Sequence, residues 1–412
     1  MNTLNTDAVI IGGGAAGLLA AGYLGQKGMK TLIVEPNKLL GKKLRITGKG
    51  RCNVTNNCEV RQFLENVPVN GKFLYGAVSN FTPMDTMLLF EKLGVALKTE
   101  RGNRVFPVSD NAHEVANALE RFSKRGGVKH LQERALEIKT ENGAVCGVIT
   151  DKSVISCRQV LLCTGGMSYP GTGSTGDGYA MAEAVGHRII QPKPSLVPLE
   201  ASDDYCEQLQ GFSLKNVKLN VADAESGKTV FSELGEMLFT HFGISGPLVL
   251  SASSHLREAE LSRYRISIDL KPGLDNKQLD DRILRDFSKY ANKDFKNSLT
   301  DLAGHAMIPV LIRLSGIPED IKVNSITRAQ RTELVQLFKS FPVHVTGKRP
   351  IDEAIITSGG VCVKDINPKT MESKLVRGLY FAGEIIDVDA YTGGYNLQIA
   401  WSTAFAAANS ME

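Results

Sequence analysis

The chain has 412 residues, of which 42% are hydrophobic and 22% charged, and its formal net charge is +4. A chain of this length buries a large core and should divide into two or three domains. The small net charge does not by itself indicate a polyanionic partner, because nucleic-acid-binding modules concentrate far more positive charge.

The distribution of residue types argues against membrane, secreted and metal-binding classes. The most apolar run, residues 8–24, is interrupted by glycines and does not predict a transmembrane helix. The opening MNTLNTD lacks the basic and apolar regions of a secretory signal, so we expect a cytoplasmic protein. Seven cysteines without CxxC or Cys/His spacing predict neither a disulfide framework nor a metal site.

The N-terminal segment has the pattern of a βαβ unit. Residues 7–11 and 31–34 are apolar and predict strands, and residues 15–27 predict a helix between them. The glycine-rich GGGAAG joins the first strand to the helix, which is the context of a dinucleotide-binding turn.

Each glycine of this turn has a separate physical role. Gly12 permits the tight turn, Gly14 lets the backbone approach a pyrophosphate, and Gly17 lets the helix pack closely. Glu35, which ends the second strand, is expected to accept hydrogen bonds from the adenosine ribose. NAD and FAD would fit this half of the pattern equally well.

The next segment, GKKLRITGKGRCNVTN at 41–56, combines glycines with hydrogen-bond donors from Arg51, Asn53 and Asn56. Its place after the βαβ unit predicts that it lies over the redox ring or the diphosphate of the cofactor. Cys52 is then a candidate acid that protonates a substrate carbon while hydride reaches the neighbouring carbon. A small buried thiol is an equally weighted alternative.

Cys52 and Cys58 also suggest the redox pair of a disulfide reductase. Five residues separate them where that class has four, and no second GxGxxG follows to hold NADPH. We therefore disfavour this function.

Two helices and a β-meander come next. Residues 83–93 predict a helix capped by Thr82, and Ser109 is expected to cap a second helix that ends near Lys124. Residues 135–157 alternate between apolar and polar side chains, which is typical of a β-meander.

Residues 160–163 predict a buried parallel strand, and the glycine-rich CTGGMSYPGTGSTGDGY follows. Thr164, Gly165 and Gly166 form the turn directly after this strand, which is expected beside the cofactor phosphates. A flexible surface loop is the alternative.

The chain then changes character. Prolines at 192, 194 and 198 predict a linker, and residues 196–270 alternate as short strands of a second, β-rich domain. Residues 279–314 and 328–340 have helical spacing and predict a helical insert.

The C-terminal segment returns to the first domain and favours FAD over NAD. Residues 378–382 predict a strand, after which Gly383 and Glu384 are expected to meet the ribityl and pyrophosphate groups. An NAD-only dehydrogenase has no need of such a segment.

A closing helix is expected over residues 396–408, begun by Asn396 and Leu397. A helix N-terminus at the pyrimidine edge of a flavin would stabilise the negative charge that develops on reduction. An ordinary core helix is the alternative.

These motifs resemble one family from end to end. The segments GGGAAG, TGKGRCNVTN, RVFPVSD, CTGGMSYPGTGSTGDGY, LFTHFGISGP, TSGGV, TMESKLVRGLYFAGEIIDVD and GGYNLQIAWSTAF are, in this order, similar to the BaiN/RdsA (YhiN-type) bacterial NAD(P)/FAD-dependent flavoproteins.

The resemblance implies an α/β fold in three parts that agrees with the pattern above. A discontinuous, glutathione-reductase-like Rossmann-type FAD-binding domain carries an inserted β-barrel-like domain, which itself carries a helical subdomain. We expect the FAD-binding domain at 1–190 and 356–412, the β-rich domain at 191–272 and 341–355, and the helical insert at 273–340.

The resemblance also implies the reaction. Members are associated with reduction of uridine to dihydrouridine in large-subunit ribosomal RNA, or with reduction of bile-acid intermediates, and both add hydride to an activated C=C bond. NADPH or NADH would be a transient hydride donor. A small-molecule enone reductase and a non-catalytic flavin-binding protein are the rival functions.

From the second domain, LFTHFGISGP offers Thr240, His241 and Ser245 as substrate contacts, with His241 a second candidate acid. A satisfied structural histidine is the alternative. With a single tryptophan, the chain offers no aromatic RNA platform, so a base would be read by flavin stacking and hydrogen bonds.

For an RNA substrate, clustered basic residues would contact phosphates if their loops rim one cleft, although a solvated face is the alternative. They are Lys42, Lys43, Arg45, Lys49, Arg51, Arg101, Arg104, Lys348 and Arg349.

Cys52 and His241 are thus the candidate catalytic residues, and no metal ligand is expected. The expected cofactor-binding residues are Gly12, Gly14, Ala15, Ala16, Gly17, Glu35, Lys43, Arg51, Asn53, Thr164, Gly165, Gly383, Glu384, Asn396 and Leu397.

Overall fold

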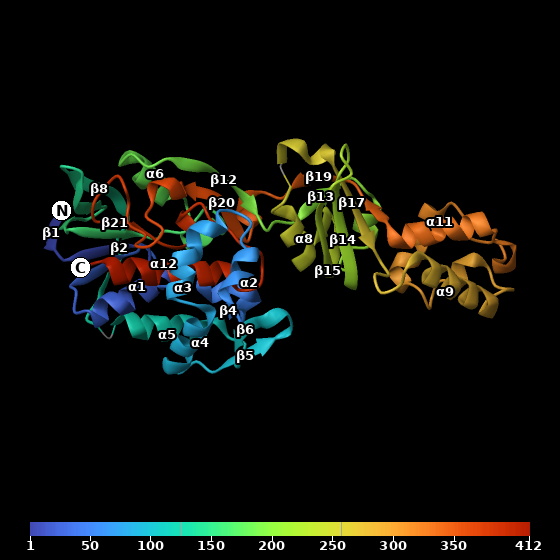
Figure 1. The fold of residues 1–412 in the computed structure, drawn as a ribbon, viewed down its shortest axis with the longest axis horizontal. Helices are drawn as coiled ribbons and strands as arrows, with labels where there is room; N and C mark the ends of the chain where they lie inside the picture. The colour runs from blue at the N-terminus through green and yellow to red at the C-terminus, as the bar shows by residue number, and fades with distance from the viewer. Residues whose placement is uncertain (125, 257) are drawn as a thin grey trace. The chain divides into compact units, whose positions relative to one another are not determined.

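A computed structural model describes residues 1–124, 126–256 and 258–412. The chain divides into two compact units, one of residues 1–195 and 351–412 and the other of residues 196–350. Each unit has its own hydrophobic core. Figure 1 shows the blue N-terminal and red C-terminal segments within one unit. The first unit is therefore discontinuous in sequence.

The first unit is built on a five-stranded parallel sheet with the order β21-β11-β2-β3-β7. Strand β2, in the middle, is buried along its whole length, as expected of a sheet covered on both faces. The strands span Leu379–Phe381 (β21), Gln159–Leu162 (β11), Ala8–Ile11 (β2), Thr31–Val34 (β3) and Lys129–Leu131 (β7).

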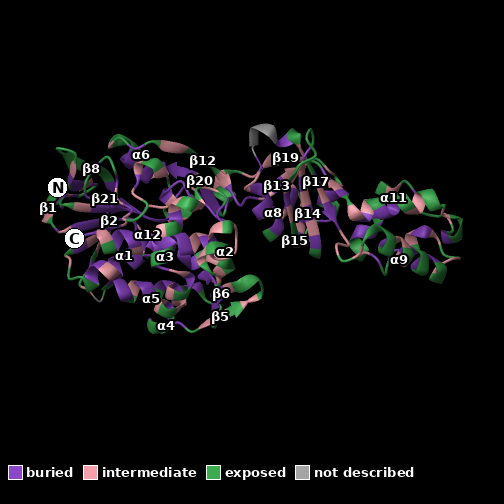
Figure 2. Ribbon diagram, in the orientation of Figure 1, coloured by how far each residue is buried: buried purple, intermediate pink, exposed green. Residues whose placement is uncertain are grey.

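Helices α1 (Ala15–Gln26) and α12 (Tyr395–Ser410) pack against each other beside this sheet. Both are apolar around most of their circumference, and Figure 2 shows them mainly in the colour of buried residues. The rings of Tyr23 and Phe405 meet edge to face at 5.0 Å between centroids. The predicted βαβ unit and closing helix are confirmed.

The two predicted helices of the N-terminal half differ in how they begin. Helix α4 (Pro83–Lys92) has the predicted Thr82 cap, completed by Asp85 in a capping box. Helix α5 (Ala112–Lys124) begins later than expected, and the Asn111 side chain accepts a hydrogen bond from the backbone N–H of His113. The predicted Ser109 cap is wrong, because the Ser109 hydroxyl bonds to Glu114 instead.

The predicted meander is confirmed as β8 (Ala135–Glu141), β9 (Ala144–Thr150) and β10 (Ser153–Ser156). Strand β1 (Asn2–Asn5) joins it in parallel with β10. A smaller antiparallel sheet has the order β4-β6-β5. Its strands span Thr55–Asn56 (β4), Arg104–Pro107 (β6) and Leu97–Glu100 (β5), and three further helices of this unit span Val60–Glu65 (α2), Tyr75–Asn80 (α3) and Asp177–Ala184 (α6).

The predicted linker at prolines 192 and 194 is wrong. Both lie in β12 (Ile189–Ser195), which pairs antiparallel with β20 (Ile356–Val361). The pair is only two strands wide and its register shifts between Ile190 and Lys193, so prolines cost few ladder hydrogen bonds there.

The second unit contains a seven-stranded antiparallel sheet with the order β18-β17-β14-β15-β16-β13-β19. Its strands span Phe341–Val343, Tyr264–Asp269, Ser213–Asp223, Thr229–Thr240, Gly243–Ser245, Leu199–Ala201 and Val345–Lys348 in that order. The helices of this unit are α7 (Tyr205–Gln208), α8 (Pro247–Ser253), α9 (Asn276–Lys289), α10 (Ile308–Ser315) and α11 (Arg328–Lys339).

The expected helix over residues 279–314 is two helices, because α9 ends at Lys289 and α10 begins only at Ile308. The stretch between them contains Asp294, Asn297 and Gly304, which favour turns over helix. The helices and the sheet share one hydrophobic core. The expected boundary at residue 273 is thus a change of secondary structure within a continuous core.

Candidate functional site

The glycine turn between β2 and α1 leaves no room for side chains at two positions. A Cβ on Gly12, whose φ is +112°, would lie 2.5 Å from the carbonyl oxygen of Cys163, and a Cβ on Gly17 would lie 2.0 Å from that of Gly12. Both contacts are far below van der Waals distance. The tight turn and the close helix packing predicted from the sequence are therefore required by the fold itself.

Gly14 differs from both, because a Cβ there would meet no protein atom within 4 Å. Its φ of −81° is open to any residue, so the fold does not require glycine at this position. Gly14 is also the N-cap of α1, and no side chain caps this helix. An open position beside uncapped N–H groups is a cradle for a phosphate group.

Glu35 follows β3 and lies against the glycine turn. One carboxylate oxygen accepts a hydrogen bond from the backbone N–H of Gly13 at 2.9 Å, and the other accepts from the side chain of Asn37 at 2.7 Å and from its backbone N–H at 2.9 Å. Ionised carboxylates offer about four acceptor positions, so capacity remains for a ribose hydroxyl.

The C-terminal turn lies directly against the N-terminal one. Gly383 has φ +76°, and a Cβ there would lie 3.3 Å from the Cβ of Ala16 in the first turn of α1. Its backbone N–H donates to the Thr403 hydroxyl of α12 at 2.9 Å. Residues 367 positions apart in sequence thus form one surface, as the resemblance implied.

A third segment, after β11, completes this surface. A Cβ on Gly166 would lie 3.0 Å from a carboxylate oxygen of Glu384, and Gly165 has φ +79°. The Thr164 hydroxyl is buried, with no hydrogen-bond partner in the described structure. The turns after β2, β11 and β21 meet at the carboxyl edge of the parallel sheet, where ligands bind in open α/β folds.

Lys43 ties these turns together. Its ammonium nitrogen lies 2.7 Å from Glu384 and 2.7 Å from the Ser168 hydroxyl, and both charged side chains are about one-fifth exposed. Glu384 also accepts from the backbone N–H of Thr357 at 2.9 Å. Lys43 and Glu384 therefore lie together, with Ser168 and Thr357 as partners that the sequence motifs did not identify.

The segment after the glycine turn is clamped to the start of α12. Asn56 donates from its side-chain amide to the carbonyls of Gly393 and Gly102, both at 3.0 Å. Gly394, the N-cap of α12 with φ +97°, approaches so closely that a Cβ would lie 2.4 Å from the carbonyl of Thr55. The indole of Trp401 donates to the carbonyl of Val54 at 2.9 Å.

Gln398 is a residue of this region that the sequence reasoning missed. It is fully buried and accepts hydrogen bonds from the hydroxyls of Thr55 (2.6 Å) and Thr86 (2.8 Å). Its amide nitrogen donates to the carbonyl of Phe81 and to the Ser402 hydroxyl, both at 3.0 Å. A glutamine in the middle of the apolar run LQIAW was the sequence signal that could have found it.

Five further predicted site residues lie at the start of α1, before α12 or within the 41–56 segment. The Asn396 side chain bonds to the backbone of Ala390 and Tyr391, which fixes the loop before α12, and Leu397 is half-buried beside it. The side-chain oxygen of Asn53 is buried with no hydrogen-bond partner in the described structure. Ala15 and Ala16 form the first turn of α1.

Arg51 is held by ion pairs, and Cys52 is enclosed in the core. The Arg51 guanidinium pairs with Glu100 and Asp110 and lies 4.1 Å from the Phe106 ring centre. Cys52 is fully buried, and burial raises the pKa of its thiol to about 12. Their assigned roles stay predictions.

The basic residues expected to contact RNA differ in their surroundings. Arg45 is buried against the Leu40 carbonyl, Asn117 and Glu120, while Lys43 and Arg51 are ion-paired. Lys348 and Arg349 belong to the other unit. His241, the second candidate acid, is exposed in that unit between β15 and β16, edge to face with Phe242.

Asp389, in the loop before α12, gives the site a predicted pH dependence. It is 2% exposed and accepts from the Ser195 hydroxyl at 2.9 Å. Burial raises the pKa of its carboxyl to about 6, and the neighbouring carboxylate of Asp387 adds to this effect. The folded state holds the Asp389 proton more tightly than the unfolded state, so protonation of Asp389 stabilises the fold. This contribution to the free energy of unfolding is complete below about pH 4 and is lost as the pH rises through 6.

We therefore expect Asp389→Asn to gain stability over the wild type as the pH rises from about 4 to 7, by up to roughly 3 kcal/mol. Unfolding midpoints of both proteins across this range measure the effect. Asp352→Asn, at an exposed carboxylate, is the matched control. A constant difference between Asp389→Asn and wild type at every pH would contradict the assignment.

The residues present fit FAD. The open position at Gly14, the uncapped start of α1 and the free acceptor capacity of Glu35 suit a pyrophosphate joined to adenosine. The start of α12 also has no side-chain cap. A second helix N-terminus suits the pyrimidine edge of a flavin, which NAD lacks.

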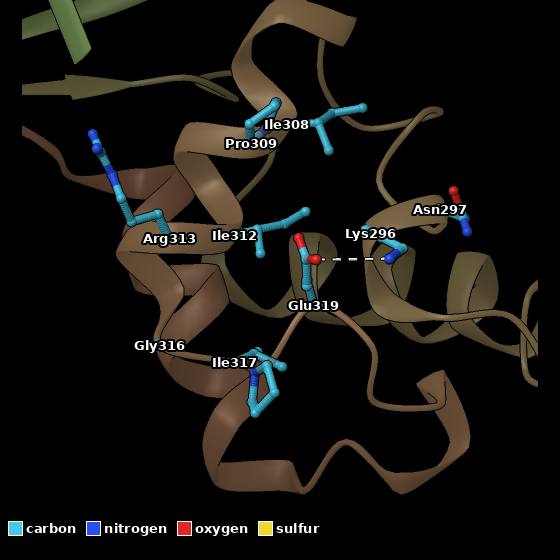
Figure 3. A pocket seen from close by; sticks show the side chains of 10 residues that line it. Lys296, Asn297, Ile308, Pro309, Ile312, Arg313, Gly316, Ile317 and Glu319 are labelled. Atoms are coloured by element: carbon cyan, nitrogen blue, oxygen red, sulfur yellow. Dashed lines mark ion pairs between the residues drawn. The ribbon is translucent and has the colours of Figure 1, made fainter.

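Other candidate sites are weaker. The second unit has a groove of about 620 Å³ beside α10. Figure 3 shows its lining side chains, which include Lys296 and Glu319. It is lined by none of the predicted site residues. Among the described residues, no three histidine, cysteine or acidic side chains gather as metal ligands, and no helix has the length and hydropathy to span a bilayer.

Comparison with known proteins gives a consistent result. The family profile described as "HI0933-like protein Rossmann domain" matches residues 6–410. A protein of Escherichia coli named ribosomal RNA dihydrouridine synthase is 33% identical over 98% of each chain. A 3-dehydro-bile acid delta(4,6)-reductase of Clostridium scindens is 29% identical over 97% of each chain.

A solved structure extends the likeness to the fold. A quinol fumarate reductase of E. coli matches with a TM-score of 0.54 and 16% identity, covering 100% of this chain and 70% of that one. Together these matches confirm the predicted resemblance and a Rossmann-type FAD-binding fold.

Proposed function

The chain belongs to the HI0933-like Rossmann-domain family, and on that premise we propose that it is an FAD-dependent oxidoreductase that reduces uridine to dihydrouridine in large-subunit ribosomal RNA. The observation that carries this proposal is the similarity to the E. coli ribosomal RNA dihydrouridine synthase along the whole chain. In the proposed reaction, hydride from NAD(P)H and one proton add across the C=C bond of the base, and NAD(P)⁺ is released. The cytoplasm would supply both substrates.

The proposed roles follow from where the residues lie. Gly14 and the first N–H groups of α1 bind the pyrophosphate, and Glu35 binds the adenosine ribose. Lys43 and Glu384 hold the surrounding turns together through their 2.7 Å ion pair. Bound FAD would supply the hydride, and the N-terminus of α12 favours its reduction by stabilising negative charge.

Cys52, His241 and a bound water are the proposed alternatives for the proton donor. Since its pKa is raised to about 12, Cys52 keeps its proton at neutral pH, which suits a donor, but its full burial limits access to substrate. His241 is exposed and belongs to the second unit.

The second candidate function is reduction of a small unsaturated ketone. The similarity to the bile-acid reductase of C. scindens favours it, at 29% identity over 97% of the chain. Both functions require the same hydride and proton transfer, so the residues named above serve either one.

A product assay separates the two functions. The purified protein is incubated with NADPH or NADH and either unmodified large-subunit ribosomal RNA or a 3-oxo-Δ4,6 bile acid, and products are identified by mass spectrometry. We expect dihydrouridine in the RNA, with little turnover of the bile acid. Reduction of the bile acid alone would reject the RNA function, and no product with either substrate would favour a non-catalytic flavin-binding protein.

A further inference from the structure

One surface of the first unit combines excess positive charge with a direct link to the proposed flavin site. It is formed by the turn 47–53 and by residues 97–110, which include the β5–β6 hairpin. These two segments carry five cations, Lys49, Arg51, Lys98, Arg101 and Arg104, and two carboxylates, Glu100 and Asp110. The surface therefore carries three more positive than negative charges, and its two segments are separate in the sequence.

Two of the five cations form ion pairs with both carboxylates. Arg51 pairs with both Glu100 and Asp110, and Lys98 lies 2.7 Å from Asp110 and 3.7 Å from Glu100. These contacts lower the pKa of both carboxyl groups, as expected of carboxylates held in ion pairs.

The other three cations, Lys49, Arg101 and Arg104, make no ion pair with any described residue. Lys49 and Arg101 are exposed, and Arg104 is half-buried. Arg104 donates only to the backbone carbonyl of Arg101, at 3.0 Å, with its guanidinium 5.8 Å from the Phe106 ring centre. An unpaired guanidinium that is packed against an aromatic ring is held in place for an anion.

The three cations are gathered by the fold. The turn containing Lys49 lies against the hairpin, since a Cβ on Gly48 would be 3.7 Å from the Phe106 ring and Val54 bonds to the carbonyl of Val105 at 2.8 Å. Lys49 has φ +58°. A left-handed conformation at a residue other than glycine costs conformational free energy, and such strained residues often lie at functional sites.

The Asn56 side chain contacts both the hairpin and the segment before α12. The Asn56 amide donates to the carbonyl of Gly102, at the hairpin tip, and to that of Gly393, before α12, both at 3.0 Å. Figure 2 shows the hairpin tip in the colour of exposed residues. Phosphates bound at the tip would flank a nucleotide presented to the N-terminus of α12.

We propose that Lys49, Arg101 and Arg104 bind the phosphate backbone of the RNA substrate on either side of the target uridine. The inference rests on the proposed RNA function and assigns its phosphate contacts to these three residues, separately from the paired Arg45 and Arg51. Lysine and arginine bind phosphates by charge without reading sequence, so these contacts position the RNA.

The test replaces all three charges at once, in Lys49→Gln/Arg101→Gln/Arg104→Gln. Binding to unmodified large-subunit ribosomal RNA transcribed in vitro is measured between about 50 and 200 mM salt. We expect affinity to fall roughly 10- to 100-fold and the slope of log K against log salt to shrink by about two to three. Bound FAD and the rate of its reduction by NADPH should stay at wild-type values.

The matched control, Arg121→Gln/Lys139→Gln/Lys152→Gln, removes the same charge from exposed positions elsewhere in the unit that likewise make no ion pair with a described residue. It should change RNA affinity less than twofold. If the wild type binds and reduces RNA but the first triple variant does so with the same affinity and slope, the phosphate assignment is wrong and the proposed function stands. If the wild type neither binds nor reduces RNA, the proposed function fails, and the phosphate assignment with it.

Discussion

Gly14→Val should abolish FAD binding while leaving the fold intact. A valine side chain at this position meets no protein atom near its Cβ, so it fills only the space beside the uncapped start of α1. That is where the second glycine of the motif lets a pyrophosphate approach the backbone. We expect FAD affinity to fall by roughly 100-fold or more, or about 3 kcal/mol.

FAD per chain after gel filtration measures the loss, and Trp401 reports the fold. Trp401 is the single tryptophan of the chain and lies buried in α12. Urea unfolding of the FAD-free proteins, followed by its fluorescence, should shift by only about 1 kcal/mol, the cost of a poor N-cap residue. Gly273→Val, at another open glycine, is the control and should keep its FAD. Normal FAD content in Gly14→Val would contradict the proposed site.

Gln398→Leu should produce the largest loss of stability. Leucine has a similar volume, but it removes the acceptor of two buried hydroxyls, Thr55 and Thr86, and the donor to the carbonyl of Phe81. Each buried polar group left without a partner costs about 1–3 kcal/mol. We expect the first unit to lose roughly 3–5 kcal/mol in urea unfolding followed by Trp401 fluorescence.

Gln62→Leu, on the exposed face of α2, makes the same change without burial and should shift stability by less than about 0.5 kcal/mol. The comparison separates the network from a general effect of leucine. A loss of under about 1 kcal/mol in Gln398→Leu would mean that the hydroxyls find other partners, and that the clamp between residues 53–56 and α12 does not depend on Gln398.

Local patterns predicted much of the first unit. Strand β3 and the start of α1 are as expected, because alternation, glycine turns and helical periodicity act over a few residues. Prolines 192 and 194 misled the prediction, because the partner strand β20 lies more than 160 residues later. The helix expected over 279–314 is interrupted by several residues that favour turns, and each of them alone has only a weak effect against helix formation.

Where a motif carries the expected chemistry, the placement of its residues in the fold followed from the sequence. Gly12, Gly17 and Glu35 lie as their spacing implied, since the βαβ unit fixes all three. The partners of Lys43, Glu384 and Gln398 could not be predicted, because Ser168, Thr357 and Thr55, respectively, reach them only through tertiary packing. The separation of paired from unpaired basic residues likewise depends on which carboxylates the fold brings near.

The most direct test of the account is anaerobic reduction of the purified protein by NADPH, followed by addition of unmodified large-subunit ribosomal RNA while the visible absorbance of the flavin is recorded. We predict that NADPH bleaches the flavin and that RNA restores its absorbance, with dihydrouridine formed in proportion to the flavin reoxidised. Flavin that stays reduced with RNA but is reoxidised by an enone would contradict the RNA function.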